Sequence, residues 1–155
     1  MIVDDSHFPL VILSLGREFD QASIATFERG MEKLFARREK FAIACDLRAL
    51  SKAPDAIVRK QLTDLLNRED FKAKQDRYQV GSSNIVDSAP IRAALTAVFW
   101  LWRPRAPMHA ASDLPEAATW AVGQLRAAGV PIDPSLDAYA RSLGSSKSAS
   151  GRSGI

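Results

Sequence analysis

Short apolar runs alternate along this chain with segments whose apolar residues recur every three or four positions, and this alternation limits the possible folds most strongly. The apolar runs occupy residues 9–15, 41–45, 78–80 and 108–111. Each is followed by a helical pattern, and these patterns begin near Asp20, Pro54, Pro90 and Asp113. Buried strands that alternate with amphipathic helices are typical of layered α/β domains. The sequence therefore predicts an α/β layer fold in which a four-stranded, mainly parallel sheet alternates with four helices.

Polar residues at the ends of these segments support the same reading. Asp20 can accept backbone N–H groups at a helix start, and Asp113 and Glu116 have the spacing of a capping box. Gly129, with Pro131 after it, is expected to end the last helix. The second helix is expected to end near Lys74. The sequence leaves open whether residues 2–3 add a short edge strand and whether residues 130–143 add a short helix.

The length of 155 residues predicts one domain, over residues 1–143, followed by a flexible tail rich in serine and glycine over residues 144–155. With 46% hydrophobic and 25% charged residues, the composition is that of a soluble globular protein. The net charge is +3, and two of these charges, Lys147 and Arg152, lie in the tail. Such a weak basic excess does not favour nucleic-acid binding.

Cys45 is the one cysteine in the sequence, so no intramolecular disulfide can form and no zinc pattern is present. We expect no bound metal and no cofactor. The N-terminus begins with acidic residues at Asp4 and Asp5 where a secretory signal needs cations, and the apolar run after it is too short to span a bilayer. We therefore expect a cytoplasmic protein without membrane insertion.

Three stretches of the sequence resemble the SpoIIAA-like group, the STAS domains of anti-sigma-factor antagonists and their relatives. Residues 41–47 resemble the apolar strand that ends in Asp-Leu, residues 94–101 the third helix of a SEC14-labelled bacterial subgroup, and residues 116–120 its last helix. The resemblance covers roughly residues 1–129 and implies a STAS-like fold and a regulatory or scaffolding role. Phosphorylated members carry an Asp-Ser pair before the second helix; here residues 50–56 lack it, and Ser51 is the hydroxyl nearest to that position.

Polar residues at the carboxyl ends of the predicted strands form the first candidate site. In open parallel sheets, ligands bind at this rim, beside helix N-termini that favour anions. Two arginines could hold a carboxylate or phosphate while hydroxyl and amide groups add hydrogen bonds. The residues are Arg17, Asp46, Arg48, Ser82, Ser83 and Asn84, with Asp87 beside them. Alternatively, Asp46 pairs with an arginine and the serines and asparagine cap the next helix.

The outer face of the third predicted helix forms the second candidate site. Trp100 lies nine positions after Ile91 and therefore on the side opposite the buried stripe. Small residues share this face, and tryptophan is enriched at binding hot spots. The proposed contact residues are Trp100, Ala93, Thr96 and Ala97, with Arg92 and Arg103 at the edge. Their partner would be another protein or a second copy; alternatively, the C-terminal segment folds back over Trp100.

Catalytic patterns are weak in this sequence. A triad of Ser14, Asp46 and His109 is conceivable but has no motif spacing, and Asp46 is the best candidate for a general base. Cys45 is expected to be a packed, unreactive side chain. We therefore expect a non-enzymatic regulatory or scaffolding module of STAS-like type. The alternative is a small-molecule or lipid-binding protein with an anion-holding site at the strand rim.

Overall fold

The computed structural model of this chain describes the backbone of residues 1–152 and the side chains of residues 1–144. Five strands and six helices follow one another in the described part. They are β1 (Ile2–Asp4), β2 (Leu10–Ser14), α1 (Gln21–Phe35), β3 (Phe41–Asp46), α2 (Ala56–Asn67), α3 (Glu69–Tyr78), β4 (Gln79–Ile85), α4 (Ala89–Leu101), β5 (Met108–Ala111), α5 (Leu114–Ala127) and α6 (Pro134–Arg152). The α/β class predicted from the sequence is confirmed.

The sheet is mixed and its strand order follows the chain, β1-β2-β3-β4-β5. Strands β2 to β5 are parallel, whereas β1 pairs antiparallel with β2, with Ile2 opposite Ser14. The predicted four-stranded sheet is therefore corrected to five strands. Residues 2–4 are too few to give a clear strand pattern in the sequence, and their pairing with β2 is what makes them a strand.

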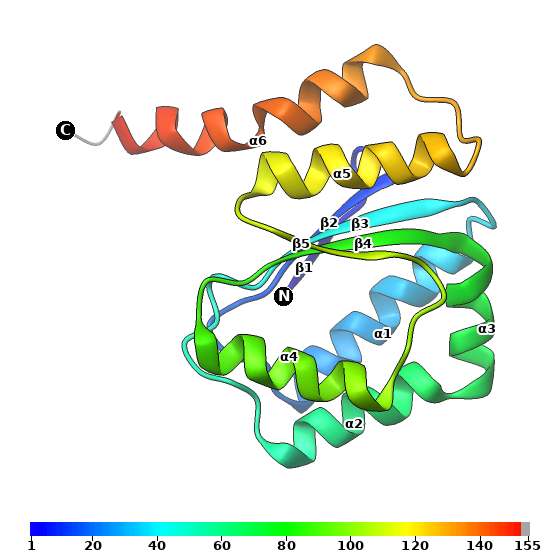
Figure 1. Cartoon of the computed structure of the whole chain (residues 1–155), viewed down its shortest axis with the longest axis vertical. Coiled ribbons are helices and arrows are strands. Elements are labelled where there is room, and N and C mark those ends of the chain that lie inside the picture. The colour runs from blue at the N-terminus through cyan, green and yellow to red at the C-terminus, as the bar shows by residue number, and fades with distance from the viewer. Residues whose placement is uncertain (153–155) are drawn as a thin grey trace.

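The helices form two layers, one on each side of the sheet (Figure 1). Helices α1 to α4 cover one face, and α5 with α6 outside it covers the other. The order of strands explains the first layer, because right-handed crossovers that always step in the same direction return on the same face. Side chains alternate between the layers, so Val11 and Ile43 face α1 to α4 while Leu10 and Ala42 face α5.

The predicted helix starts are present as capping hydrogen bonds. Asp20 accepts from the Ser23 backbone N–H at 3.0 Å, and Asp113 accepts from that of Glu116 at 2.9 Å. The Glu116 carboxylate reaches back to the Ser112 backbone N–H at 2.8 Å. Gly129 has φ of +81°, the left-handed conformation that commonly ends a helix, as predicted.

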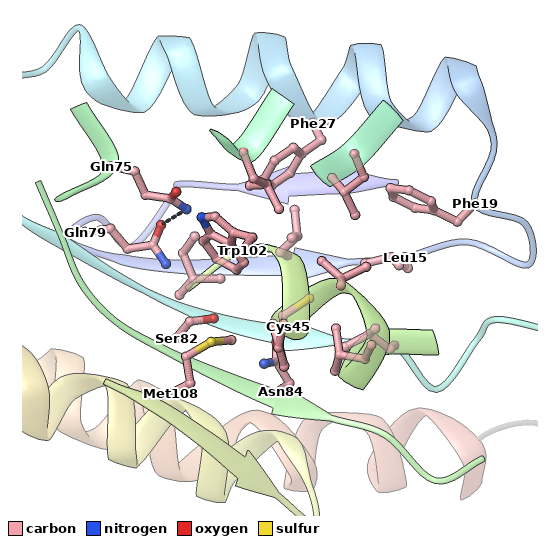
Figure 2. A pocket seen from close by; sticks show the side chains of 18 of the residues that line it. Leu15, Phe19, Phe27, Cys45, Gln75, Gln79, Ser82, Asn84, Trp102 and Met108 are labelled. Atoms are coloured by element: carbon pink, nitrogen blue, oxygen red, sulfur yellow. Dashed lines mark hydrogen bonds between the residues drawn. The ribbon is translucent and has the colours of Figure 1, made fainter. Parts of the chain in front are cut away.

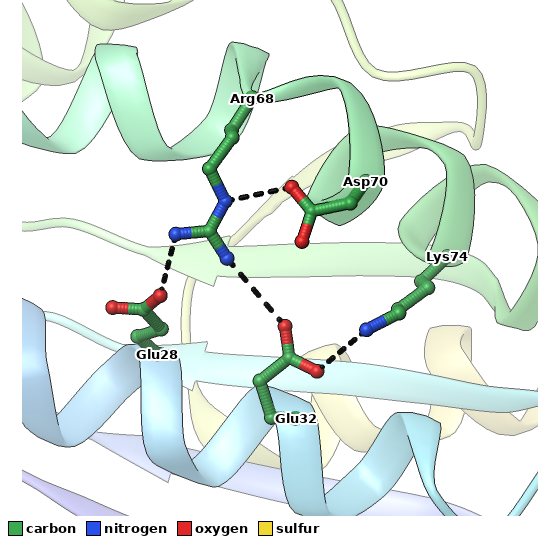
Figure 3. Close-up of polar contacts among 5 residues, drawn as sticks. All are labelled: Glu28, Glu32, Arg68, Asp70 and Lys74. Atoms are coloured by element: carbon green, nitrogen blue, oxygen red, sulfur yellow. Dashed lines mark hydrogen bonds and ion pairs between the residues drawn. The ribbon is translucent and has the colours of Figure 1, made fainter.

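The second predicted helix is two helices, which accounts for one of the two helices beyond the four predicted; the other is α6. Helix α2 ends at Asn67 and α3 begins at Glu69, with Arg68 in an extended conformation between them. The Arg68 guanidinium contacts Asp70 and Glu28 at 2.7 Å and Glu32 at 3.7 Å, and Glu32 also pairs with Lys74 at 2.9 Å (Figure 3). Hydrogen bonds to Asp70 and Glu28 raise the pKa of Arg68. The break between α2 and α3 thus places Arg68 where its guanidinium links α1 to α3.

Strand β4 is longer than predicted and begins later, because Tyr78 belongs to α3. It continues through Ser82, Ser83 and Asn84 to Ile85, between β3 on one side and β5 on the other. The polar composition hid this part of the strand. In a central strand, backbone pairing on both sides outweighs the low strand propensity of such residues.

Helix α6 packs on α5, with Leu136 and Ala140 buried in their contact. Tyr139 stacks on His7 with ring centroids 3.5 Å apart, and Asp137 pairs with Arg126. The helical backbone passes residue 143 and ends at Arg152. The predicted tail includes residues 153–155, which lie outside the described residues, and its flexibility stays a prediction.

Candidate functional site

The outer face of α4 carries the most exposed large apolar side chain in the described part of the chain, Trp100, and a second exposed one beside it. Trp100 is 74% exposed and Leu101, beside it, is 68% exposed. The small residues Ala93, Thr96 and Ala97 are also exposed on this helix. Helix α6 lies on the opposite layer, so its described residues do not cover Trp100. The face named from the sequence is therefore accessible as one surface.

The two arginines predicted at the edge of this face each take part in a hydrogen bond with another residue. Arg92 is exposed, and its guanidinium donates to the Val86 carbonyl at 3.0 Å. The carbonyl of Arg103 accepts from the Lys72 side chain at 3.3 Å. Arg92 is thus held at the N-terminal end of α4, and Arg103 follows the C-terminal end. The α4 surface consists of Trp100, Leu101, Ala93, Thr96 and Ala97, with Arg92 and Arg103 at its two ends.

At the strand rim, Asp46, the last residue of β3, binds Arg48, which follows the strand. The Arg48 guanidinium donates two hydrogen bonds to the Asp46 carboxylate, at 2.9 and 2.8 Å. Asp46 also accepts from the Arg48 backbone N–H at 3.0 Å. The hydrogen bond to Asp46 raises the pKa of Arg48. This is the arrangement expected when the pair has a structural role, and it occupies the guanidinium that an anion would need.

The remaining rim residues are not brought together around one point. Arg17 is exposed, and its carbonyl accepts from the Ser51 backbone N–H and hydroxyl, both at 2.9 Å. Ser82, Ser83 and Asn84 are in the strand, so their side chains alternate between the faces of the sheet. Ser82 and Asn84 face the α1 to α4 layer, while Ser83 is fully buried under α5. The six predicted residues therefore do not form one anion site in this structure.

His109 on β5 is the centre of a hydrogen-bonded cluster, as a histidine in a strand of the sheet usually is. His109 Nδ1 lies 2.9 Å from Ser83 Oγ, its Nε2 lies 4.0 Å from Glu116, and its ring stacks on Trp120 at 5.0 Å. The order of serine, histidine and carboxylate is that of a hydrolase triad. However, Ser83 is fully buried and lines none of the described cavities, so its hydroxyl cannot reach a substrate. Of the triad considered from the sequence, Ser14 pairs with Asp46 across neighbouring strands, whereas His109 lies on β5.

A cavity of about 130 Å³ lies between the sheet and the helices of the α1 to α4 layer (Figure 2). Most of its lining is apolar. It includes Leu13, Ile43 and Cys45 from the sheet and Phe27, Leu62, Leu66, Leu95, Val98 and Phe99 from the helices. Gln75, Gln79, Ser82, Asn84 and the indole of Trp102 add polar groups. The sequence does not show which polar residues line this cavity, because they are scattered over α3, β4 and the end of α4.

Cys45 is buried in the wall of this cavity. Burial, with the negative charge of Asp46 as a second cause, raises the pKa of the Cys45 thiol to about 12. A thiol that stays protonated is neither a nucleophile nor a metal ligand at neutral pH. The structure therefore agrees with the packed, unreactive cysteine expected from the sequence.

No protein-family model and no curated protein matches this sequence. Within the described residues, no three His, Cys, Asp or Glu side chains gather into a group that could hold a metal ion. Among the described helices, none combines the length and the apolar character needed to cross a membrane.

Proposed function

We propose that this protein is a non-enzymatic interaction module of STAS-like type and that the α4 surface is its contact surface. The observation that carries the proposal is the exposure of Trp100, at 74%, next to Leu101 on a helix face of small residues. Exposed single aromatics are common, but adjacent exposed tryptophan and leucine side chains beside a flat patch favour association. The α/β fold, with its amphipathic helices on both sides of the sheet, supports the STAS-like part of the proposal.

The partner that we propose is a second copy of this chain. Trp100 and Ala93 are seven positions apart, about two helical turns, and lie on the same stripe. In an antiparallel pair of α4 helices, a twofold axis between Thr96 and Ala97 places Trp100 of one copy over Ala93 of the other. Each bulky side chain then meets a small one, twice, as a self-complementary interface requires.

The polar sites of the molecule give less support to an enzyme. Asp46, the best candidate base, is bound by Arg48 and lines none of the described cavities. Ser83, whose hydroxyl lies 2.9 Å from His109 Nδ1, is fully buried. A regulatory role would instead use the rigid sheet to hold the α4 surface in place. The regulatory or scaffolding context and the cytoplasmic location remain parts of this proposal.

The alternative is a small-molecule or lipid-binding protein with an anion-holding site at the strand rim. Its anion-holding site has less support than its small-molecule site. Its anion site needs both Arg17 and Arg48, and the Arg48 guanidinium already holds the Asp46 carboxylate. Neither arginine lines the cavity of the α1 to α4 layer. This alternative stays a prediction, and the small-molecule binding that it includes depends on the cavity alone.

Light scattering over a dilution series tests the proposed dimer. The wild-type chain should change from dimer mass to monomer mass on dilution, whereas Trp100→Ala should be monomeric at concentrations where the wild type is a dimer. Ile2→Ala is the matched control, because Ile2 is similarly exposed but lies on β1, at the other edge of the sheet from β5. A wild-type monomer at every concentration, or a Trp100→Ala dimer as stable as the wild type, would remove the proposal.

A further inference from the structure

The cavity of the α1 to α4 layer contains two polar atoms that have no hydrogen-bond partner among the described residues. They are the side-chain oxygen of Gln75 and the indole nitrogen of Trp102. Both side chains are more than nine-tenths buried, at 5% and 6% exposure, and both line the cavity. Leaving a buried donor or acceptor unpaired costs about 1 to 3 kcal/mol. Two such groups in one cavity are therefore unusual for a core whose only task is stability.

The orientation of Gln75 is set by its neighbour. The Gln75 amide nitrogen donates to the Gln79 side-chain oxygen at 3.0 Å, within the buried core. The Gln75 oxygen is then left as an acceptor, while the Trp102 N–H is a donor. Figure 2 shows Gln75, Gln79 and Trp102 together at one end of the cavity, with Leu15 and Phe19 at the other. The cavity thus has a polar end and an apolar end.

A larger hollow, of about 810 Å³, lies on the surface beside Arg38 and Arg77. None of the buried unpartnered atoms found in the described residues lies in its lining. The internal cavity is therefore the better candidate for a built site. A second, smaller cavity of about 60 Å³ shares Leu15, Phe19 and Leu62 with it and extends toward Leu50 and Pro54.

We propose that the internal cavity is a binding site for a small neutral aromatic molecule that carries one hydroxyl group, of the phenol class. A hydroxyl can accept from Trp102 Nε1 and donate to Gln75 Oε1 at the same time. The volume of about 130 Å³ is close to the roughly 150 Å³ of a dry protein cavity known to hold benzene. The ligand is neutral because no lysine or arginine lines the cavity among the described residues, and a buried unpaired anion is very costly. This site does not depend on the α4 dimer.

Phenol and toluene form a matched pair of probes, because they have the same number of heavy atoms and differ in the hydroxyl group. We would titrate each into the full chain and follow the three indole N–H signals by two-dimensional NMR. Phenol should saturate with a dissociation constant of about 1 mM, as expected for so small a ligand. It should shift the Trp102 signal and leave that of the exposed Trp100 in place. Toluene should bind at least tenfold more weakly, since it leaves both polar groups unpaired.

Two variants assign the effect to the polar end. Trp102→Phe removes the donor, and Gln75→Leu removes the acceptor with little change in side-chain size. Each variant should bring the phenol and toluene affinities to within about threefold of each other. Trp120→Phe is the matched control, because Trp120 stacks on His109 outside this cavity, and it should keep the tenfold preference. A circular dichroism melt of each variant shows that it folds.

Three results would overturn the proposal. The first is equal affinity of the wild-type chain for phenol and toluene, which would make the cavity an unselective apolar void. The second is a phenol titration that leaves the Trp102 signal unmoved. The third is a long-lived water at the Trp102 N–H that saturating phenol does not displace, which would make the cavity a hydrated structural element. Each result is read from the wild-type chain and so does not depend on the folding of a variant.

Discussion

Trp100 and Trp102 lie two positions apart at the end of α4 and have opposite environments. Trp100 is 74% exposed, whereas Trp102 is 6% exposed and closes the polar end of the cavity. Trp100 is in the last turn of α4, whereas Trp102 follows the helix in an extended conformation and its side chain lies in the cavity wall. The same short segment therefore supplies the anchor of the proposed dimer and the donor of the proposed ligand site.

The protonation of Cys45 gives a prediction for the pH dependence of stability. The pKa of this thiol is about 12 in the folded chain, above its ordinary value of 9.0, so the folded state keeps the proton longer than the unfolded state does. The resulting stability is fully present below pH 9 and is lost as the pH rises toward 12. Between pH 7.5 and 10, wild type should lose about 1 kcal/mol more unfolding free energy than Cys45→Ala.

Urea unfolding of both proteins at the two pH values measures this difference. Comparing the two chains removes the contribution of the tyrosines and lysines, which titrate in the same range in both. A loss of equal size in wild type and Cys45→Ala would show that burial does not hold the proton on this thiol.

At the scale of elements, the joint between α2 and α3 depends on Arg68. Its guanidinium contacts carboxylates on α1 and α3, and it lies at a point where the backbone is not helical. Arg68→Ala should lower the unfolding free energy by about 1 kcal/mol at low salt, the upper end for partly exposed ion pairs. The loss should shrink in 1 M NaCl, where charges are screened within about 3 Å.

Lys60→Ala is the control for this variant, because Lys60 makes an isolated exposed pair with Asp64 on one helix at 2.7 Å. Its loss should be about 0.3 to 0.5 kcal/mol. Thermal unfolding of both variants at the two salt concentrations gives the comparison. If Arg68→Ala costs no more than Lys60→Ala, the Arg68 contacts do not hold the joint together.

Local signals in the sequence predict some elements well and miss others for physical reasons. The starts of α1 and α5 follow from Asp20 and Asp113, because capping is a local interaction between residues three apart. The break at Arg68 depends on Glu28, forty positions away, and has no local signal. The strand conformation of Ser82 to Asn84 likewise depends on β3 and β5, which the sequence does not place beside it.

The candidate sites show the same distinction. The exposure of Trp100 follows from helix periodicity, so the α4 surface could be named from the sequence. The pairing of Asp46 with Arg48 was one of two readings, and only the structure separates them. The cavity needs Gln75 on α3 and Trp102 at the end of α4 to meet, and their spacing along the chain does not indicate this.

At the scale of the whole molecule, the strand order explains why the two proposed sites lie on one layer. The connections between β2 and β5 all return on the same face, so α1 to α4 lie together and enclose the cavity. Helix α4 forms part of the cavity wall through Val98 and Phe99 and presents Trp100 outward. Helices α5 and α6 cover the other face and leave the α4 surface open.

Disulfide trapping tests the central claim, a symmetric dimer through α4, most directly. In the proposed dimer the twofold axis passes between Thr96 and Ala97, so cysteines at position 97 of the two copies lie close to the axis and close to each other. Ala97→Cys should form a covalent dimer under mild oxidation, while the native Cys45 is buried and does not react. The control is Thr119→Cys, at an exposed position of α5 in the other layer. After the same treatment, this variant should run as a monomer in non-reducing gel electrophoresis. Rapid and nearly complete cross-linking of Ala97→Cys alone is the predicted result; equal, slow cross-linking of both variants would contradict the account.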